Sequence, residues 1–209
     1  MYSFRLSAVA KKGAKFYFSV FLSLLATASR RDPKVAMTSF FQILENEIKA
    51  DSGEFNYGQT ITTSYLPNEN DKFFDGSDNL IDWLRQYSKE QDETFIRGFL
   101  GKMLFSKEEA LKKTNVLSGG EKVRCMLSKM MLSGANVLML DQPTAHLDLE
   151  SVTAVNDGIR KFDGTVIFTS QDHEFVQNVA DRIIDIDVIL KEDVYSTYDD
   201  YINSQRSVD

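Results

Sequence analysis

The segment "NVLMLDQPTAHLD", residues 136 to 148, holds the side chains of this sequence best suited to chemistry. Its apolar residues form a run that ends at Asp141, which predicts a buried strand that delivers a carboxylate to the edge of a sheet. Such a carboxylate suits a phosphate-bound metal such as Mg²⁺. The next residue, where hydrolysis needs a second carboxylate, is the amide Gln142. The segment therefore has the outline of a metal site without a general base.

A second segment, "VLSGGEKVR", residues 116 to 124, predicts the start of a helix. Ser118 and Glu121 have the spacing of a capping box, in which the hydroxyl caps the helix and the glutamate returns to the Ser118 amide. Gly119 and Gly120 leave the first-turn amides uncovered. Bare amides at the positive end of a helix dipole form an anion site. An ordinary helix cap explains the same residues when they are taken alone.

The two segments together resemble the ATP-binding cassette (ABC) superfamily. The matching stretches are Leu117 to Glu121 for its signature, Val137 to Asp141 for its Walker B strand, and Leu147 with Asp148 for its D-loop. The stretch "PTAHLDLES" is most similar to the ABC-F group of non-transporter cassettes, whose usual version has Asn where Ala145 stands. The resemblance covers roughly residues 31 to 204 and implies a P-loop-NTPase-like fold.

The phosphate loop departs from the family pattern. A P-loop reads G-x-x-x-x-G-K-[ST], because its glycines let backbone amides wrap the phosphates and its lysine reaches their oxygens. The corresponding window is "RDPKVAMT", residues 31 to 38. Arg31 and Ala36 replace the glycines, and Met37 replaces the lysine. Pro33 also removes one amide donor. These substitutions predict weakened phosphate binding.

Other family positions are partly kept. Thr38 remains as the hydroxyl that could meet Mg²⁺. Gln142 stands where the family has its catalytic glutamate, and Gln171 stands where it has its switch histidine. Asn68 aligns with the Q-loop glutamine. The neighbouring His173 is expected to be a surface residue on the next helix.

The resemblance also implies which residues form the sites. The two substituted catalytic positions are Gln142 and Gln171, and the Mg²⁺ ligands are Thr38 and Asp141. The implied nucleotide-binding residues are Met37, Thr38, Ser39, Asn68, Leu117, Ser118, Gly119, Gly120, Glu121 and Asp148. ATP and Mg²⁺ are the implied cofactors, and both are expected to bind weakly.

The composition sets limits on partners. The 209 residues carry a formal net charge of −7, so the surface as a whole repels phosphate backbones and direct DNA binding is not expected. The single cysteine, Cys125, excludes an internal disulfide and is expected to be a buried small hydrophobe. No apolar run reaches the roughly 18 residues that a membrane span needs.

The N-terminus permits two interpretations. Three lysines precede "FYFSVFLSLLATA", residues 16 to 28, which has the outline of a signal peptide. The alternative is a strand that leads into the phosphate-loop window, with residues 1 to about 12 loosely held. We expect the second, and a cytoplasmic location, because the rest of the chain resembles cytoplasmic machinery.

Periodicity predicts the elements that position these residues. Helices are expected at 38–48, in three pieces over 79–113, at 116–132, 150–162 and 172–180, and in a short piece within 196–205; strands are expected within 51–58, 59–67, 136–141, 165–170 and 182–188. This alternation predicts an α/β fold with a mainly parallel sheet flanked by helices. We expect an atypical segment at 1–30, one nucleotide-binding domain at 31–204 with a small helical subdomain at about 79–132, and a tail at 205–209.

The expected function is that of an ABC-F-type cassette that binds ATP at a composite site formed with another cassette, with hydrolysis weak or lost. The resemblance makes a second cassette the expected partner, in trans or in an upstream missing half, and links the group to the ribosome. The alternatives are a non-catalytic scaffold, a fragment of a tandem-cassette translation factor, and the ATP-binding subunit of a transporter.

Overall fold

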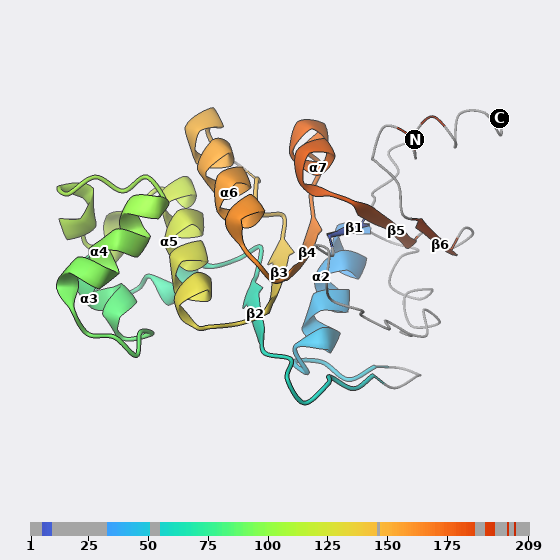
Figure 1. Cartoon of the computed structure of the whole chain (residues 1–209), viewed down its shortest axis with the longest axis horizontal. Coiled ribbons are helices and arrows are strands. Elements are labelled where there is room, and N and C mark those ends of the chain that lie inside the picture. Colours follow the sequence, from blue (N-terminus) through green and yellow to red (C-terminus); the bar gives the residue numbers. More distant parts are fainter. Residues whose placement is uncertain are drawn as a thin grey trace.

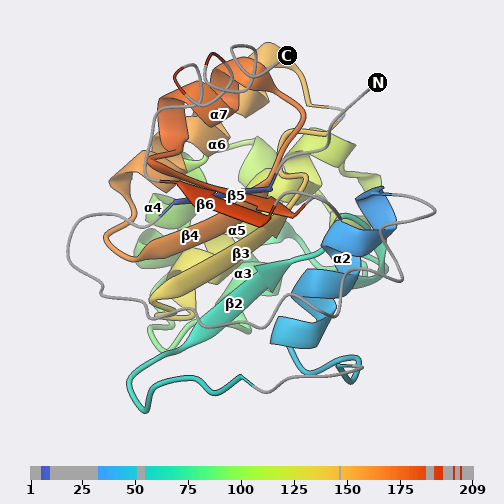
Figure 2. The ribbon, with the colours of Figure 1, turned by 90° about the vertical axis from the view of Figure 1, so that its right-hand side faces the viewer.

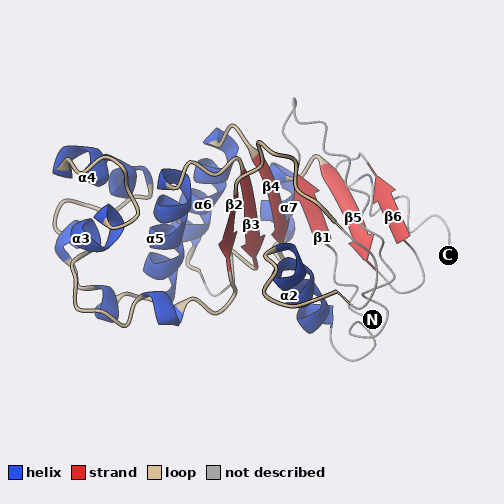
Figure 3. Cartoon of the chain, turned by 90° about the horizontal axis from the view of Figure 1, so that it is seen from below, coloured by secondary structure: helices blue, strands red, loops and turns tan. Residues whose placement is uncertain are grey.

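A six-stranded sheet forms the centre of the structure, a computed structural model that describes residues 6–9, 33–50, 55–145, 147–186, 191–194, 200 and 203. Its strands, in the spatial order β2-β3-β4-β1-β5-β6, are β1 (Leu6–Val9), β2 (Thr63–Leu66), β3 (Val137–Asp141), β4 (Thr165–Thr169), β5 (Arg182–Ile186) and β6 (Lys191–Val194). β2, β3 and β4 are parallel, and β1, β5 and β6 extend the sheet with antiparallel pairs (Figure 3). The parallel half is the part that carries the predicted site.

Helices cover both faces of this sheet. α2 (Pro33–Leu44) lies on one face, and α6 (Leu149–Lys161) and α7 (His173–Val179) lie on the other (Figures 2 and 3). All five residues of β3 and of β4 are buried. Because successive side chains on a strand point to opposite faces, Leu138 and Leu140 join the core on the α6–α7 side, and Asp141 points to α2.

A group of helices stands at one end of the molecule, beside β2 and away from β6 (Figure 1). It consists of α3 (Leu80–Arg85), α4 (Glu93–Lys102) and α5 (Gly119–Leu132), with short 3₁₀ turns η2 (Asp71–Phe73), η3 (Glu109–Leu111) and η4 (Thr114–Val116). The side chains of Asn79 and Asp92 cap α3 and α4. The Trp83 ring stacks on Phe74 with centroids 4.9 Å apart. All of these elements except η2 lie within residues 79–132, the range expected for a helical subdomain, and that they form a separate subdomain stays a prediction.

The layered α/β fold with parallel strands β2, β3 and β4 flanked by helices is confirmed, and so are the helices predicted at 116–132, 150–162 and 172–180. One expected element boundary was wrong. α2 begins at Pro33, five positions before the predicted start, because proline is favourable at the first helical position. Residues 55–58 contain no strand, and the rest of the strand expected within 51–58 falls on residues 51–54, which lie outside the described residues.

The two ends of the chain add strands that the sequence pattern did not predict. Residues 1 to 12 were expected to be loosely held, yet β1 at 6–9 pairs with both β4 and β5. β6 was also not predicted, and it pairs with β5. The proposed signal-peptide segment at 16–28 and the strand predicted within it lie outside the described residues, as does most of the tail helix predicted within 196–205.

Two composition-based expectations can be compared with the structure. Cys125 has no exposed surface, and burial raises the pKa of its thiol, which confirms it as a buried small hydrophobe. Among the helices that the structure describes, none combines the length and apolar character required to cross a bilayer.

Candidate functional site

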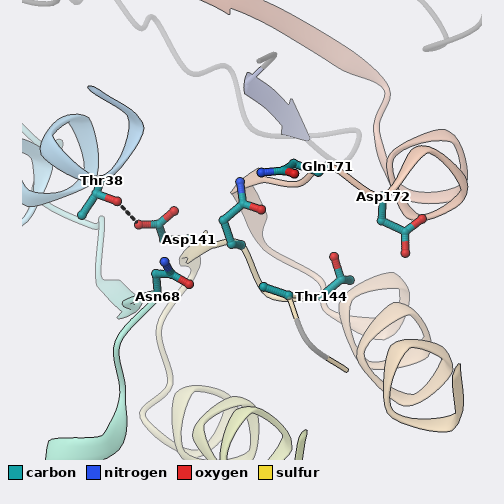
Figure 4. Close-up of a pocket in the computed structure, with 8 residues that line it drawn as sticks. Thr38, Asn68, Asp141, Thr144, Gln171 and Asp172 are labelled. Atoms are coloured by element: carbon teal, nitrogen blue, oxygen red, sulfur yellow. Dashed lines mark hydrogen bonds between the residues drawn. The ribbon is translucent and has the colours of Figure 1, made fainter. Parts of the chain in front are cut away.

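A pocket of about 380 Å³ opens at the edge of the sheet where β3 and β4 end. Figure 4 shows its lining, which consists of Thr38, Asn68, Asp141, Gln142, Thr144, Ala145, Gln171 and Asp172. Five of these are predicted site residues, and they come from α2, from the segment after β2, and from the ends of β3 and β4. The carboxyl ends of parallel strands meet at one edge of a sheet, which is why distant parts of the chain converge there.

Asp141 is 2% exposed and accepts hydrogen bonds from two hydroxyl groups. Thr38 Oγ1 donates to Oδ2 at 2.6 Å, and Thr169 Oγ1 donates to Oδ1 at 3.0 Å. Burial raises the pKa of Asp141, and the two hydrogen bonds lower it only in part, so the pKa stays above its ordinary value. The carboxylate is therefore incompletely compensated, and a bound cation would stabilise it.

Thr38 and Met37 are neighbours in α2 with different surroundings. Thr38 reaches Asp141, whereas Met37, one position and about 100° away around the helix, is 5% exposed and packs in the core. Neither Met37 nor Ser39 lines the pocket. The window that corresponds to the phosphate loop is helical from Pro33 onward. The structure thus brings the predicted Mg²⁺-binding hydroxyl into the pocket, and the side chain at the lysine position points elsewhere.

Gln142 and Gln171 both line the pocket, as the sequence predicted. Gln142 has φ 55°, in the left-handed region that non-glycine residues rarely adopt, and its N–H donates to Thr169 Oγ1 at 3.0 Å. Both side chains are amides, which can orient water but cannot accept its proton. His173 is exposed on α7 and is not part of the lining, as expected. Both predicted catalytic positions thus lie in the pocket, but neither side chain can act as a general base.

Sequence reasoning missed several residues of this pocket. Thr144, Ala145 and Asp172 line it, and Thr169 and Ser170 stand directly behind the lining. Thr144 Oγ1 and Ser170 Oγ share a hydrogen bond at 2.9 Å. Ser170 Oγ also accepts from the Asp172 N–H at 3.1 Å. The available signal was the polar run "TSQD" after the apolar part of β4, because parallel strands that end together place such residues beside Asp141.

The predicted signature segment lies apart from this pocket. Ser118 Oγ accepts from the Glu121 N–H at 3.3 Å and Glu121 Oε2 accepts from the Ser118 N–H at 2.8 Å, which confirms the capping box. Leu117 and Glu121 are buried, and Ser118 and Gly119 are exposed. None of residues 117–121 lines the pocket. The chain therefore presents two separate sets of predicted nucleotide contacts.

Asp148, the predicted D-loop residue, lies near the predicted signature rather than in the pocket. Its Oδ1 accepts from the Ser151 N–H at 2.8 Å and caps α6. A Cβ atom at Gly120 would lie 2.9 Å from Ser151 Oγ, so a larger residue there would displace the Ser151 side chain at the start of α6. The glycine thus has a packing role as well as the predicted amide exposure.

Comparison with known proteins fits this geometry. The family model described as ABC transporter matches residues 36–145, more than half of the chain. The chain belongs to the ABC family. This cassette is 57% identical over 173 residues to the "Uncharacterized ABC transporter ATP-binding protein YkpA" of Bacillus subtilis (strain 168), covering 82% of the cassette and 32% of that protein. It is 29% identical over 160 residues to "ABC transporter F family member 5" of Arabidopsis thaliana, covering 76% and 23% respectively.

A solved structure shares the fold of the cassette. It is described as the "Crystal structure of the complex of archaeal ribosomal stalk protein aP1 and archaeal ribosome recycling factor aABCE1", and it matches with a TM-score of 0.59 and 25% identity, over 69% of this chain and 28% of that one. The cassette thus has a P-loop-NTPase fold, and its relatives include a member of the ABC transporter F family. It spans about a third or less of the length of these curated relatives.

Proposed function

We propose that the cassette binds Mg²⁺ and ATP in the pocket at the ends of β3 and β4 and turns ATP over slowly or not at all. The observation that carries the proposal is the Thr38 Oγ1 to Asp141 Oδ2 hydrogen bond of 2.6 Å at this pocket. It joins a hydroxyl and a carboxylate across 103 positions of sequence, at the places where the family pattern has Mg²⁺ ligands.

The donor atoms fit the cation. Mg²⁺ prefers oxygen ligands and is usually held by one or two protein groups plus substrate phosphates and water. Thr38 Oγ1 and both Asp141 oxygens supply such atoms, and burial raises the pKa of Asp141, so a bound cation would stabilise its charged form. When bound, Mg²⁺ would neutralise charge on the phosphates. Thr38 and Asp141 would orient it, and Asn68 lines the same pocket.

The residues around this pair argue against efficient hydrolysis. Phosphoryl transfer depends on charge neutralisation and on positioning of the attacking water. Met37 is buried in the core and offers no charge to the phosphates. Gln142 and Gln171 can hold a water by hydrogen bonds, but neither can take its proton. General-base catalysis contributes about 10²–10⁴ in rate, so its loss leaves a cassette that binds more than it turns over.

The signature segment completes the proposal. Ser118 and Gly119 are exposed at the start of α5 and remote from the pocket of their own chain. We infer that they contact a nucleotide held by another cassette, together with Asp148. The likeness to a ribosome recycling factor supports a ribosomal role, which we propose over service to a transporter, and with it a cytoplasmic location.

A scaffold without nucleotide is the second candidate function. The burial of Met37 and the helical conformation of the window from Pro33 favour it, because both remove parts of a phosphate-binding loop. A fragment of a tandem-cassette translation factor remains a third interpretation of the same residues.

Calorimetric titration with ATP separates these functions. We expect the cassette to bind ATP more tightly with Mg²⁺ than with EDTA, and Asp141→Asn to remove that difference. Asp157→Asn makes the same change at an exposed position of α6 and should leave both affinities unchanged. A folded cassette that binds no ATP under either condition would support the scaffold, and Mg²⁺-independent binding would remove Thr38 and Asp141 from the site.

A further inference from the structure

Thr169, the last residue of β4, lies behind the pocket and does not line it. It is 1% exposed, so neither nucleotide nor solvent reaches it. The register of the parallel strands pairs Thr169 with Asp141, the last residue of β3. Because paired residues of parallel strands point to the same face, the Thr169 hydroxyl lies beside the Asp141 carboxylate on the side that faces α2.

The single hydroxyl of Thr169 makes two hydrogen bonds in the site. Its proton goes to Asp141 Oδ1 at 3.0 Å, and its oxygen accepts from the Gln142 N–H at 3.0 Å. A hydroxyl has one proton to donate, and this one is committed to the carboxylate. The oxygen of the same hydroxyl accepts from the backbone of Gln142, a residue with the unusual φ of 55°. One group therefore fixes both the carboxylate and the residue that follows it.

Thr38 and Thr169 hold opposite oxygens of Asp141 in different ways. Thr38 Oγ1 contacts Oδ2 from the pocket side and is itself a proposed Mg²⁺ ligand. Thr169 Oγ1 contacts Oδ1 from the buried side. Ser170, the next residue, extends the same attachment by its hydrogen bond with Thr144. The end of β4 thus holds the segment after Asp141 at two points.

We propose that Thr169 is a positioning residue, which aims the Asp141 carboxylate at Mg²⁺ and holds Gln142 in its left-handed conformation toward the pocket. Nothing in the family resemblance assigns this role to the residue. The proposal rests on the proposed binding of Mg²⁺ and ATP for its consequence in affinity, but not for its consequence in backbone geometry.

Thr169→Val tests the proposal, because valine keeps the shape and branching of threonine and removes only the hydroxyl. Thr165→Val is a matched control, since Thr165 is a buried residue of the same strand, on the same face, at the other end. Thr169→Ser restores the hydroxyl and should restore the wild-type behaviour. All three variants are made in the full chain.

Two measurements are needed. Amide hydrogen exchange without nucleotide reports the Gln142 N–H, which we expect to exchange about tenfold faster in Thr169→Val, because its acceptor is lost. Calorimetry reports the ratio of ATP affinity with Mg²⁺ to that with EDTA, which we expect to fall about tenfold in the same variant. Thr165→Val should change neither measurement beyond a general effect of stability.

The outcomes separate the two proposals. If the wild type binds no ATP, the proposed function fails and the exchange of Gln142 alone decides the role of Thr169. An exchange rate that is the same in Thr169→Val and Thr165→Val would overturn the positioning role. An unchanged Mg²⁺ ratio in Thr169→Val, in a cassette that binds ATP, would overturn its part in metal binding.

Discussion

The pocket and the signature segment are stabilised in contrasting ways. The capping box of the signature joins residues three positions apart, and Lys112 reaches Glu121 across nine positions. The pocket joins Thr38 to Asp141 across 103 positions and Thr169 to Asp141 across 28. A locally encoded site keeps its shape through its own helix, whereas a site built on strand register depends on the whole sheet.

The buried carboxylates of the two regions have pKa values that are shifted in opposite directions. Burial raises the pKa of Glu121, but hydrogen bonds from Lys112 and the Ser118 amide outweigh it, and the net pKa is lowered. Burial raises the pKa of Asp141 too, and there the hydroxyls of Thr38 and Thr169 offset it only in part. The charge of Glu121 is compensated within the fold, whereas the charge of Asp141 is compensated only in part and would be stabilised by a bound cation.

The largest expected effect concerns turnover in the pocket. We expect phosphate release near the background rate, and Gln142→Glu alone should not restore it, because Met37 still leaves the phosphates without their lysine. A restored base would be worth about 10²–10⁴ only in an otherwise competent site. A malachite-green phosphate assay measures this, with an intact ABC cassette assayed in parallel. Rapid phosphate release by the unmodified chain would contradict the assignment of this pocket as the defective region.

The next effect concerns the signature. Ser118→Arg should weaken any ATP-dependent association with an intact cassette by about tenfold or more, because a bulky cation would occupy the exposed start of α5. Light scattering with and without ATP measures the association. Ser133→Arg introduces the same side chain at the exposed C-terminal end of the same helix and should have no effect. Equal association of both variants would remove the signature from the working sites.

A smaller effect tests local stabilisation of the signature. Glu121→Gln should lower the free energy of unfolding by about 1 kcal/mol at neutral pH, since it removes the charge that Lys112 contacts at 2.5 Å. The folded pKa of Glu121 is lowered, so its contribution is complete above the unfolded pKa and disappears as the pH falls through the folded value. Urea unfolding at several pH values should show the two proteins converging under acid conditions. Glu108→Gln, at an exposed position, serves as the control.

Replacing the carboxylate in the pocket by an amide should change the free energy of unfolding in the opposite direction. Asp141→Asn should raise the free energy of unfolding of the Mg²⁺-free chain by up to about 1 kcal/mol, because the amide carries no charge to be desolvated. The folded pKa of Asp141 is raised, so the wild type loses stability as the pH rises from the unfolded toward the folded pKa. Urea unfolding at pH 7 with EDTA measures the difference, with Asp157→Asn as control. A loss of stability in Asp141→Asn would show that the two regions do not differ in this respect.

The positions of many elements followed from the sequence. The apolar runs that end at Asp141 and Thr169 predicted β3 and β4, and the capping-box spacing of Ser118 and Glu121 predicted the start of α5. These signals are local, so periodicity and cap chemistry suffice to find them. The antiparallel strands β1 and β6 were not predicted. Each forms by pairing with another strand, β1 with β4 and β6 with β5, and a local sequence pattern does not reveal such pairing.

Sequence alone determined the residue types of the site: Asp141 at the end of a buried strand, amides at 142 and 171, and methionine at the lysine position. Only the tertiary structure decided what these residues contact. Helix rotation places Thr38 in the pocket and Met37 in the core, and strand register places the Thr169 hydroxyl beside Asp141. The reason is physical: residue type fixes which bonds a group can make, whereas packing across distant parts of the chain fixes which of them form.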